Sequence, residues 1–367
     1  MKKLFVIFAA IAMVGAFAAT TMAADWAFYG SIRFATWYDM SDNGDVIPAN
    51  GQEDDAGLNW SMQGNSRIGG KVSGGDVSGH FEMGTYKEDF DSDGVSDSQN
   101  MDVRILWGTY DFGGWTFSAG QNYTLVNNWT SVQVWGDDNG LLFNGALYGS
   151  RKQQVQLDFG MFKLALIETA SSQVIYDDTD VILPKIEASF GIPVGEGSIG
   201  IKGGVNMFTN ETFDGDDSED IMAYVLSADG FHGFGPIYFN WSAFWAQNYG
   251  NYGLYSGGNF TTGINGAVAT AAGDIEDSTA FGGTVVVGGA ISEVLRWEAG
   301  VGYIQFENDA VGSDAESMIS PYGQMKYNFA KSFYVVPEVG AFMYGDDQNG
   351  DSYGQDYYVG AQWRMDF

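Results

Sequence analysis

The sequence lacks cysteine altogether and contains only six prolines among its 367 residues. Without disulfides, a chain of this size must be stabilised by a hydrogen-bonded sheet or by a large core. Positive charge is also scarce, because 16 Lys and Arg stand against 47 Asp and Glu, and the formal net charge is -31. A chain this acidic is repelled by phosphate backbones, which excludes non-specific nucleic-acid binding.

Only one long apolar run is present, and it lies at the N-terminus. Lys2 and Lys3 precede apolar residues 4–17, and small residues follow up to Ala23. This order is typical of a cleaved signal peptide, so we expect residues 1–23 to be removed and residues 24–367 to form one domain. The alternative is an N-terminal membrane anchor, but the run is shorter than the ~20 residues that a spanning helix needs.

The remaining sequence is rich in aromatic residues (16%) and glycine (52 residues), and its polarity alternates with a period of two. Near the start, Arg33 lies between Ile32 and Phe34, and near the end Arg364 lies between Trp363 and Met365. Period-two alternation predicts β-strands. Since no other stretch resembles a spanning helix, a membrane location requires a closed barrel, which satisfies every main-chain polar group.

Short glycine-rich turns alternate with long, mostly acidic loops. The seven short turns fall at about 74–76, 111–114, 158–160, 193–197, 229–235, 288–290 and 328–331. The eight long loops fall at about 40–56, 87–99, 124–146, 169–180, 208–219, 246–278, 305–317 and 344–355. This layout predicts an all-β fold, a transmembrane antiparallel β-barrel of about 16 strands with short periplasmic turns and long external loops.

A soluble β-sandwich would show the same alternation. The barrel is favoured because the alternation continues to the last residue and because aromatic residues cluster near strand ends, as in membrane girdles. Basic residues in mid-strand also fall on the face opposite their apolar neighbours, which predicts a charged lumen. These residues are Arg33, Arg67, Arg104, Lys163, Lys202, Arg296, Lys326 and Arg364.

Three short segments resemble the general-diffusion porins of Gram-negative bacteria. They are residues 65–71 (NSRIGGK), residues 107–110 (WGTY) and residues 117–121 (FSAGQ), and the terminal Phe367 resembles the aromatic residue that the barrel-assembly machinery recognises. The resemblance implies a homotrimer in the cell outer membrane, in contact with lipid and lipopolysaccharide. It also implies that the third loop folds into the pore.

The resemblance further implies a pore constriction with a basic and an acidic side. Arg33, Arg67 and Arg104 would form the basic side, and Asp137 and Asp138 on the third loop would face them. Such a transverse field orders water and favours small polar solutes. The alternative is that the arginines pair with lumen acids for folding. Trp129 and Trp135 depart from the family pattern, and they would narrow the pore or bind a ring-shaped solute.

The second long loop carries alternating carboxylates, Asp89, Asp91 and Asp93, followed by Gly94 and then Asp97. Alternating oxygens that close on a glycine are a partial match to a calcium loop. The interpretation as a Ca²⁺ or Mg²⁺ site competes with that of a solvated acidic face. No other cofactor is expected.

Catalytic patterns are sparse. There is no cysteine nucleophile, zinc-ligand spacing is absent, and the two histidines, His80 and His232, lie near separate short turns. We therefore expect no enzyme but a water-filled channel for passive diffusion of small hydrophilic solutes and ions. The alternatives are a sugar- or anion-selective channel, a plugged structural barrel and, least favoured, an outer-membrane hydrolase.

Overall fold

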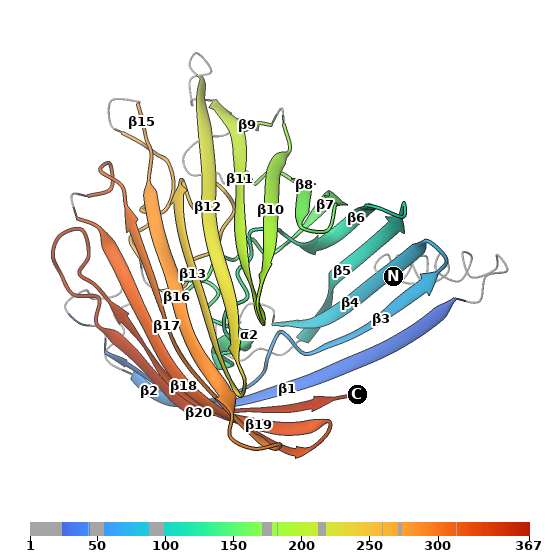
Figure 1. Cartoon of the computed structure of the whole chain (residues 1–367). Coiled ribbons are helices and arrows are strands. Elements are labelled where there is room, and N and C mark those ends of the chain that lie inside the picture. Colours follow the sequence, from blue (N-terminus) through green and yellow to red (C-terminus); the bar gives the residue numbers. More distant parts are fainter. Residues whose placement is uncertain are drawn as a thin grey trace.

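One antiparallel sheet closes on itself into a barrel in the computed structural model (Figure 1). The structure describes residues 24–42, 44, 55–87, 99–170, 178–181, 183–211, 218–258, 260–270, 274–312 and 314–367. The sheet contains the segments β1 (Asp25–Asp42), β2 (Asp55–Met62), β3 (Arg67–Gly74), β4 (Val77–Lys87), β5 (Gln99–Asp111), β6 (Thr116–Tyr123), β7 (Arg151–Asp158), β8 (Phe162–Ile167), β9 (Asp178–Asp180), β10 (Lys185–Val194), β11 (Gly197–Glu211), β12 (Ser218–Phe234), β13 (Ile237–Gln247), β16 (Thr279–Ala290), β17 (Leu295–Glu307), β18 (Glu316–Ala330), β19 (Phe333–Tyr344) and β20 (Gln355–Asp366). A separate small hairpin, β14 (Val268–Ala269) and β15 (Ile275–Glu276), lies in the connection after β13.

These eighteen segments make sixteen spanning strands. β2 and β3 follow one another along β1, and β9 and β10 follow one another along β11, so each pair is one interrupted strand. The last strand pairs with the first from Ser31 opposite Asp366 to Asp42 opposite Gln355, which closes the wall. The predicted barrel and its strand number are confirmed.

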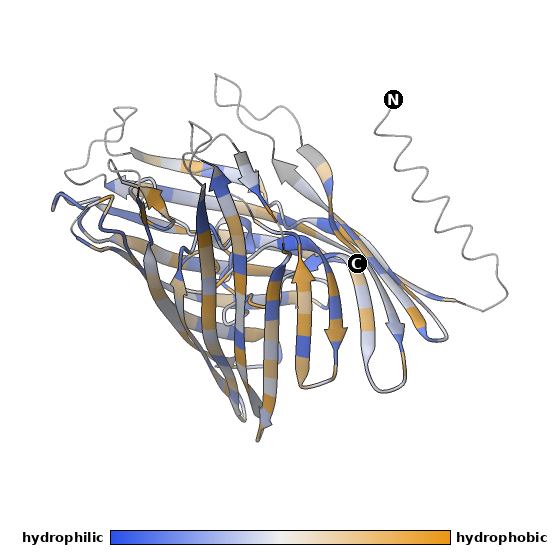
Figure 2. Cartoon of the chain, turned by 90° about the horizontal axis from the view of Figure 1, so that it is seen from above, coloured by the Kyte–Doolittle hydropathy of each residue, from blue (hydrophilic) through white to orange (hydrophobic). Residues whose placement is uncertain are grey.

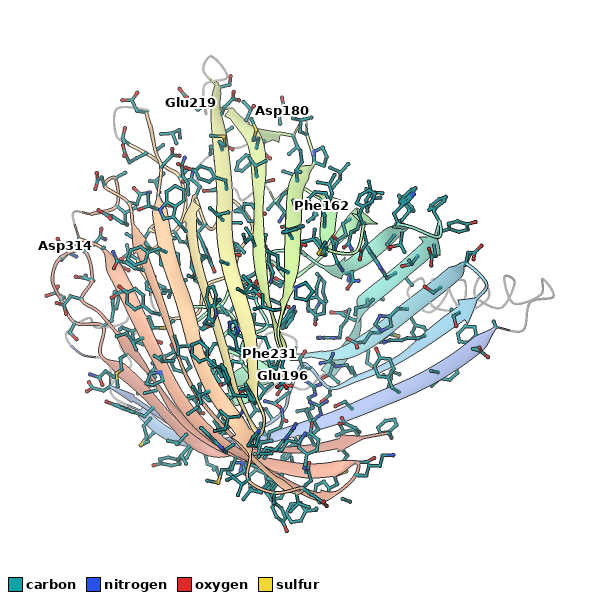
Figure 3. The ribbon with its side chains drawn as sticks, in the orientation of Figure 1. Phe162, Asp180, Glu196, Glu219, Phe231 and Asp314 are labelled. Atoms are coloured by element: carbon teal, nitrogen blue, oxygen red, sulfur yellow. The ribbon has the colours of Figure 1, made fainter. Side chains whose placement is uncertain are left out.

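The connections alternate between short turns at one end, the turn end, and long loops at the other, the loop end. Figure 3 shows Asp180 and Glu219 at the loop end and Glu196 at the turn end. One turn prediction was wrong, because Gly288 and Gly289 pair with Glu298 and Trp297 inside the sheet and the turn occupies residues 291–294. Glycine is needed at position 288 because a Cβ there would lie only 2.3 Å from the hydroxyl oxygen of Tyr238.

The two faces of the wall differ in polarity, and Figure 2 shows polar and apolar residues alternating along the strands. On β20, Val359 and Met365 are each 48% exposed on the outside, whereas Gln362 between them in the sequence is 1% exposed on the inside. The period-two alternation of the sequence therefore separates an apolar exterior from a polar lumen. No helix in the described part of the chain is long and apolar enough to cross a membrane.

We predict that a charge on the outer face destabilises the barrel more than the same charge in the lumen. Val285 lies mid-strand in β16 and is 48% exposed on the outside. Val285→Arg should lower the free energy of unfolding by about 2–4 kcal/mol in lipid vesicles, measured by urea titration, because the cation must enter the hydrocarbon. Lumen-facing Gln156→Arg is the control, and equal losses would contradict the assignment of the two faces.

Candidate functional site: the lumen and loop 3

Residues 124–150, called loop 3 here, connect β6 to β7 and contain the single helical turn α2 (Trp135–Asp138). In Figure 1 the strands of the barrel surround α2. Leu141, Leu142 and Ala146 of this loop are buried and pack with Val286 of β16 and Tyr322 of β18. Loop 3 therefore lies inside the barrel and contacts the far wall.

Three buried glutamates of the wall hold the main chain of loop 3. The donor–acceptor distances are Leu125 N (2.7 Å) and Val126 N (3.2 Å) to Glu187, Val132 N (2.8 Å) to Glu298, and Val134 N (2.7 Å) and Trp135 N (3.0 Å) to Glu338. An irregular segment inside a barrel cannot bond its amides to a neighbouring strand, so side chains must accept these bonds. This use of the three glutamates was not predicted from the sequence, although each lies between apolar neighbours on the inward face.

The approach of loop 3 to the wall is close, and its backbone is strained. A Cβ on Gly302 of β17 would lie 1.7 Å from the carbonyl oxygen of Asn144, so a side chain here would push the loop away. Four of the five non-glycine residues with positive φ in the described chain are in loop 3: Asp138, Leu141, Phe143 and Ser150. Such conformations persist where the surrounding contacts determine them, and they cluster at functional segments.

We predict that Glu338→Leu loosens loop 3, because the amides of Val134 and Trp135 lose their acceptor. Each unsatisfied amide should cost about 1–3 kcal/mol. Single-channel current should therefore show more frequent closures and flicker than in the unchanged protein. Glu196→Gln in the turn between β10 and β11 is the control. If closures are equally rare in the single-channel currents of both variants, Glu338 does not hold the loop.

Loop 3 separates two cavities of the lumen. The turn-side cavity has a volume of about 600 Å³ and the loop-side cavity about 850 Å³. The two cavities share four of their lining residues: Asn65, Asp138, Leu142 and Tyr148. These four residues lie at the boundary between the cavities, which is called the passage here. Burial raises the pKa of the Tyr148 phenol above its ordinary value, so this side chain adds no charge to the passage.

The structure brings Arg33 and Asp138 together, because the guanidinium of Arg33 donates a hydrogen bond directly to the Asp138 carboxylate. Arg67 and Arg104 lie on the second and fourth spanning strands and share a different acid, Glu82 of β4. The Glu82 carboxylate is 3.3 Å from Arg67 and 2.7 Å from Arg104. Glu82 was not among the residues predicted from the sequence, yet it pairs with two of the three predicted arginines within the wall.

Asp137 lies on the loop-side cavity and has no ion pair among the described residues. Its carboxylate accepts a hydrogen bond from the amide of Gly64 at 2.6 Å, and its carbonyl oxygen accepts one from the Asn65 side chain. The two adjacent acids therefore differ. Asp138 lies within ion-pair distance of Arg33 and Arg364, whereas Asp137 accepts hydrogen bonds from the segment between β2 and β3.

The two tryptophans of loop 3 also differ. Trp135 packs on Phe342 and Tyr358, with ring centroids 4.6 Å and 5.3 Å apart. Trp129 is 57% exposed and lines the turn-side cavity. Only Trp129 thus presents a largely open ring to that cavity.

The predicted metal loop, with Asp89, Asp91, Asp93 and Asp97, lies outside the described residues and stays a prediction. Within the described part of the chain, no group of three or more His, Cys, Asp or Glu side chains could hold a metal ion. The two histidine rings bond to aromatic side chains, His80 to the Tyr29 hydroxyl at 2.7 Å and His232 to the indole of Trp241 at 3.2 Å.

We predict that Asp138→Asn makes the pore more permeable to anions. Asp138 neutralises Arg33 and also lies 3.8 Å from Arg364, so its loss leaves one more uncompensated positive charge at the passage. The chloride-to-potassium permeability ratio, obtained from the reversal potential, should rise about twofold or more, because a unit charge at contact is worth about 1 kcal/mol even in water. Asp137→Asn, without an ion pair, is the matched control, and an equal shift in both variants would contradict the assignment.

A closed sixteen-stranded antiparallel barrel, with a loop folded between two lumen cavities, is the architecture of porin channels. No protein-family model matches the sequence, and no curated protein matches it. Solved structures do. The outer membrane channel DcaP of Acinetobacter baumannii superimposes with a TM-score of 0.70 at 19% identity, over 94% of this chain and 97% of that one.

Two further solved structures show the same fold. The anion-selective porin from Comamonas acidovorans has a TM-score of 0.56 at 14% identity, over 94% of this chain and 100% of that one. The trimer form of OmpT, an outer membrane protein of Vibrio cholerae, has a TM-score of 0.55 at 14% identity, with the same coverage of 94% and 100%. At these identities the likeness establishes the barrel fold.

Proposed function

We propose that this protein is an outer-membrane porin, a water-filled channel through which small hydrophilic solutes and ions diffuse passively. The observation that carries the proposal is the pair of lumen cavities joined at Asn65, Asp138, Leu142 and Tyr148. Loop 3 narrows the lumen at this level, and cavities extend from it toward both ends of the barrel. A narrow polar passage between two wider cavities is the geometry of a size-limited pore.

The outer surface supports a location in the membrane. Many residues that point outward are large and apolar, and the pairing of the first strand with the last closes the wall, as a barrel in lipid requires. In this proposal the short turns face the periplasm and the long loops face outward, toward lipopolysaccharide. Phe367 is 69% exposed, and its main chain bonds to Gly30 at 2.7 Å and 3.0 Å. An exposed terminal ring of this kind suits recognition by the barrel-assembly machinery.

We further propose that the working unit is a homotrimer. The outward face of β1, β2 and β20 carries a shallow groove of about 620 Å³ lined by aromatic and aliphatic residues, including Phe34, Trp60 and Trp363. The rings of Phe34 and Trp60 meet edge to face with centroids 6.0 Å apart. An apolar groove of this kind suits contact with another copy of the chain. One of the structurally similar proteins is described as a trimer form.

We predict that the purified protein, folded and inserted into a planar lipid bilayer, raises the current in discrete steps. Each step should correspond to opening of the passage at Asp138. Gly302→Trp is the informative variant, because its side chain would collide with loop 3 and displace it into the passage. Its unit conductance should fall severalfold. A correctly folded but silent protein would favour a plugged barrel or an outer-membrane hydrolase.

A further inference from the structure

Four positively charged side chains and one tyrosine form a row across five neighbouring strands on the turn side of loop 3. Arg296 of β17 is directly opposite Lys326 of β18 in the register of the sheet. Tyr334 of β19 is opposite Arg364 of β20, which is in turn opposite Arg33 of β1. The Lys326 ammonium lies 3.5 Å above the Tyr334 ring, which connects the two halves of the row. All five residues line the turn-side cavity.

Two of these cross-strand pairs bring like charges together, which destabilises a sheet. Asp138 relieves the repulsion between Arg33 and Arg364, since it pairs with the first and lies 3.8 Å from the second. Arg296 and Lys326 have no ion pair, because no carboxylate in the described chain lies within ion-pair distance of either. The fold thus keeps a repulsive pair of cations exposed to a water-filled cavity, which is the arrangement expected of an anion site.

The second acid that lines this cavity does not neutralise the pair. The carboxylate of Glu298 accepts hydrogen bonds from Val132 N at 2.8 Å, from Gln324 at 3.4 Å and from the hydroxyls of Tyr238 and Tyr322. Its oxygens are therefore committed to loop 3 and the wall. The cavity lining contains five cations (Arg33, Arg67, Arg296, Lys326 and Arg364) and two acids, Asp138 and Glu298. Arg67 pairs with Glu82 at 3.3 Å and Arg364 with Asp366 at 2.8 Å, so Arg296 and Lys326 are the lining cations without an ion pair among the described residues.

An aromatic surface shares this cavity. Trp129 is 57% exposed, and its ring lies 4.9 Å from that of Tyr123 and 6.4 Å from that of Tyr148, measured between centroids. All three rings line the cavity together with the cations. Its volume of about 600 Å³ falls in the range of small-molecule sites. A flat apolar surface beside a cationic row suits a solute that has one flat apolar part and one anionic part.

We infer that the turn-side cavity binds small organic anions that carry a ring, of the aryl carboxylate class, during their passage through the pore. Arg296 and Lys326 hold the carboxylate by charge-assisted hydrogen bonds, and the Trp129 ring contacts the ring of the solute. This inference rests on the proposed channel function and assigns a substrate class to it.

The exposed acidic residues far from the cavity do not cancel this preference. Exposed charges further away than about 10 Å at about 0.1 M salt are largely screened. The cations of the row act on a solute inside a narrow passage, where little water intervenes. The charge of the cavity therefore decides which ions pass, and the formal charge of the whole chain does not.

Two measurements on the folded protein test the inference. In a planar bilayer with a KCl gradient, the reversal potential should show preference for chloride, and benzoate should block the chloride current with roughly fivefold higher affinity than acetate, since the ring adds an aromatic contact. Equilibrium dialysis in detergent should show benzoate binding and no binding of benzyl alcohol, its uncharged counterpart.

Substitutions test the cationic part and the aromatic part of the site separately. Arg296→Gln combined with Lys326→Gln should abolish benzoate binding and shift the reversal potential toward potassium, whereas Lys326→Arg alone should retain both properties. Trp129→Ala should reduce the affinity for benzoate to that for acetate and leave chloride preference in place. Lys163→Gln is the matched control, because Lys163 pairs with Asp158 at 2.8 Å and does not line the cavity.

The outcomes separate this inference from the proposed function. A conducting pore that prefers potassium, or that benzoate and acetate block equally, would overturn the inference and leave the channel function intact. A protein that does not conduct but binds benzoate through Arg296 and Lys326 would overturn the channel function and retain the site. A protein with neither property would overturn both.

Discussion

Closure of the sheet is the constraint on which the other features of this structure depend. The register from Ser31 opposite Asp366 to Asp42 opposite Gln355 joins the first strand to the last, so each of the sixteen spanning strands has a neighbour on both sides. In hydrocarbon no water can satisfy a free main-chain group, and only a closed ring of strands solves this for a sheet. Closure also gives every residue one of two environments, the apolar exterior or the wet lumen, according to its position in the alternation.

A closed wall solves the hydrogen bonding of the strands but not that of a segment that enters the lumen. Loop 3 is irregular and brings main-chain amides into the barrel, where Glu187, Glu298 and Glu338 accept their hydrogen bonds. These carboxylates are consequently committed to structure. Glu187 also balances a buried cation, Lys185, at 3.6 Å, whereas Arg296 and Lys326 in the turn-side cavity have no ion pair among the described residues. Glu298 connects the support of the loop with the electrostatics of the lumen, because it bonds loop 3 and also lines the turn-side cavity.

The features that sequence reasoning recovers are those governed by short-range rules. Period-two alternation assigns Arg33, Arg67 and Arg104 to the inward face because successive side chains of a strand point to opposite sides. Turn chemistry assigns most connections, and it fails at Gly288 and Gly289 because glycine also occurs where a neighbouring side chain needs space. The difference between Asp137 and Asp138 is not recoverable in this way, since it depends on the backbone of α2, where Gly136 has a φ of 65°.

The sequence by itself therefore determined the barrel, its strand number, the alternation of turns and loops, and the inward direction of the charged side chains. Only the tertiary structure decided which charges meet. Arg296 and Lys326 are thirty positions apart, and Arg33 and Arg364 lie near opposite ends of the chain, yet both pairs are direct neighbours across strands. Polarity along one strand is a local property. The neighbour across the sheet depends on strand register and barrel closure, which arise only when the whole wall has formed.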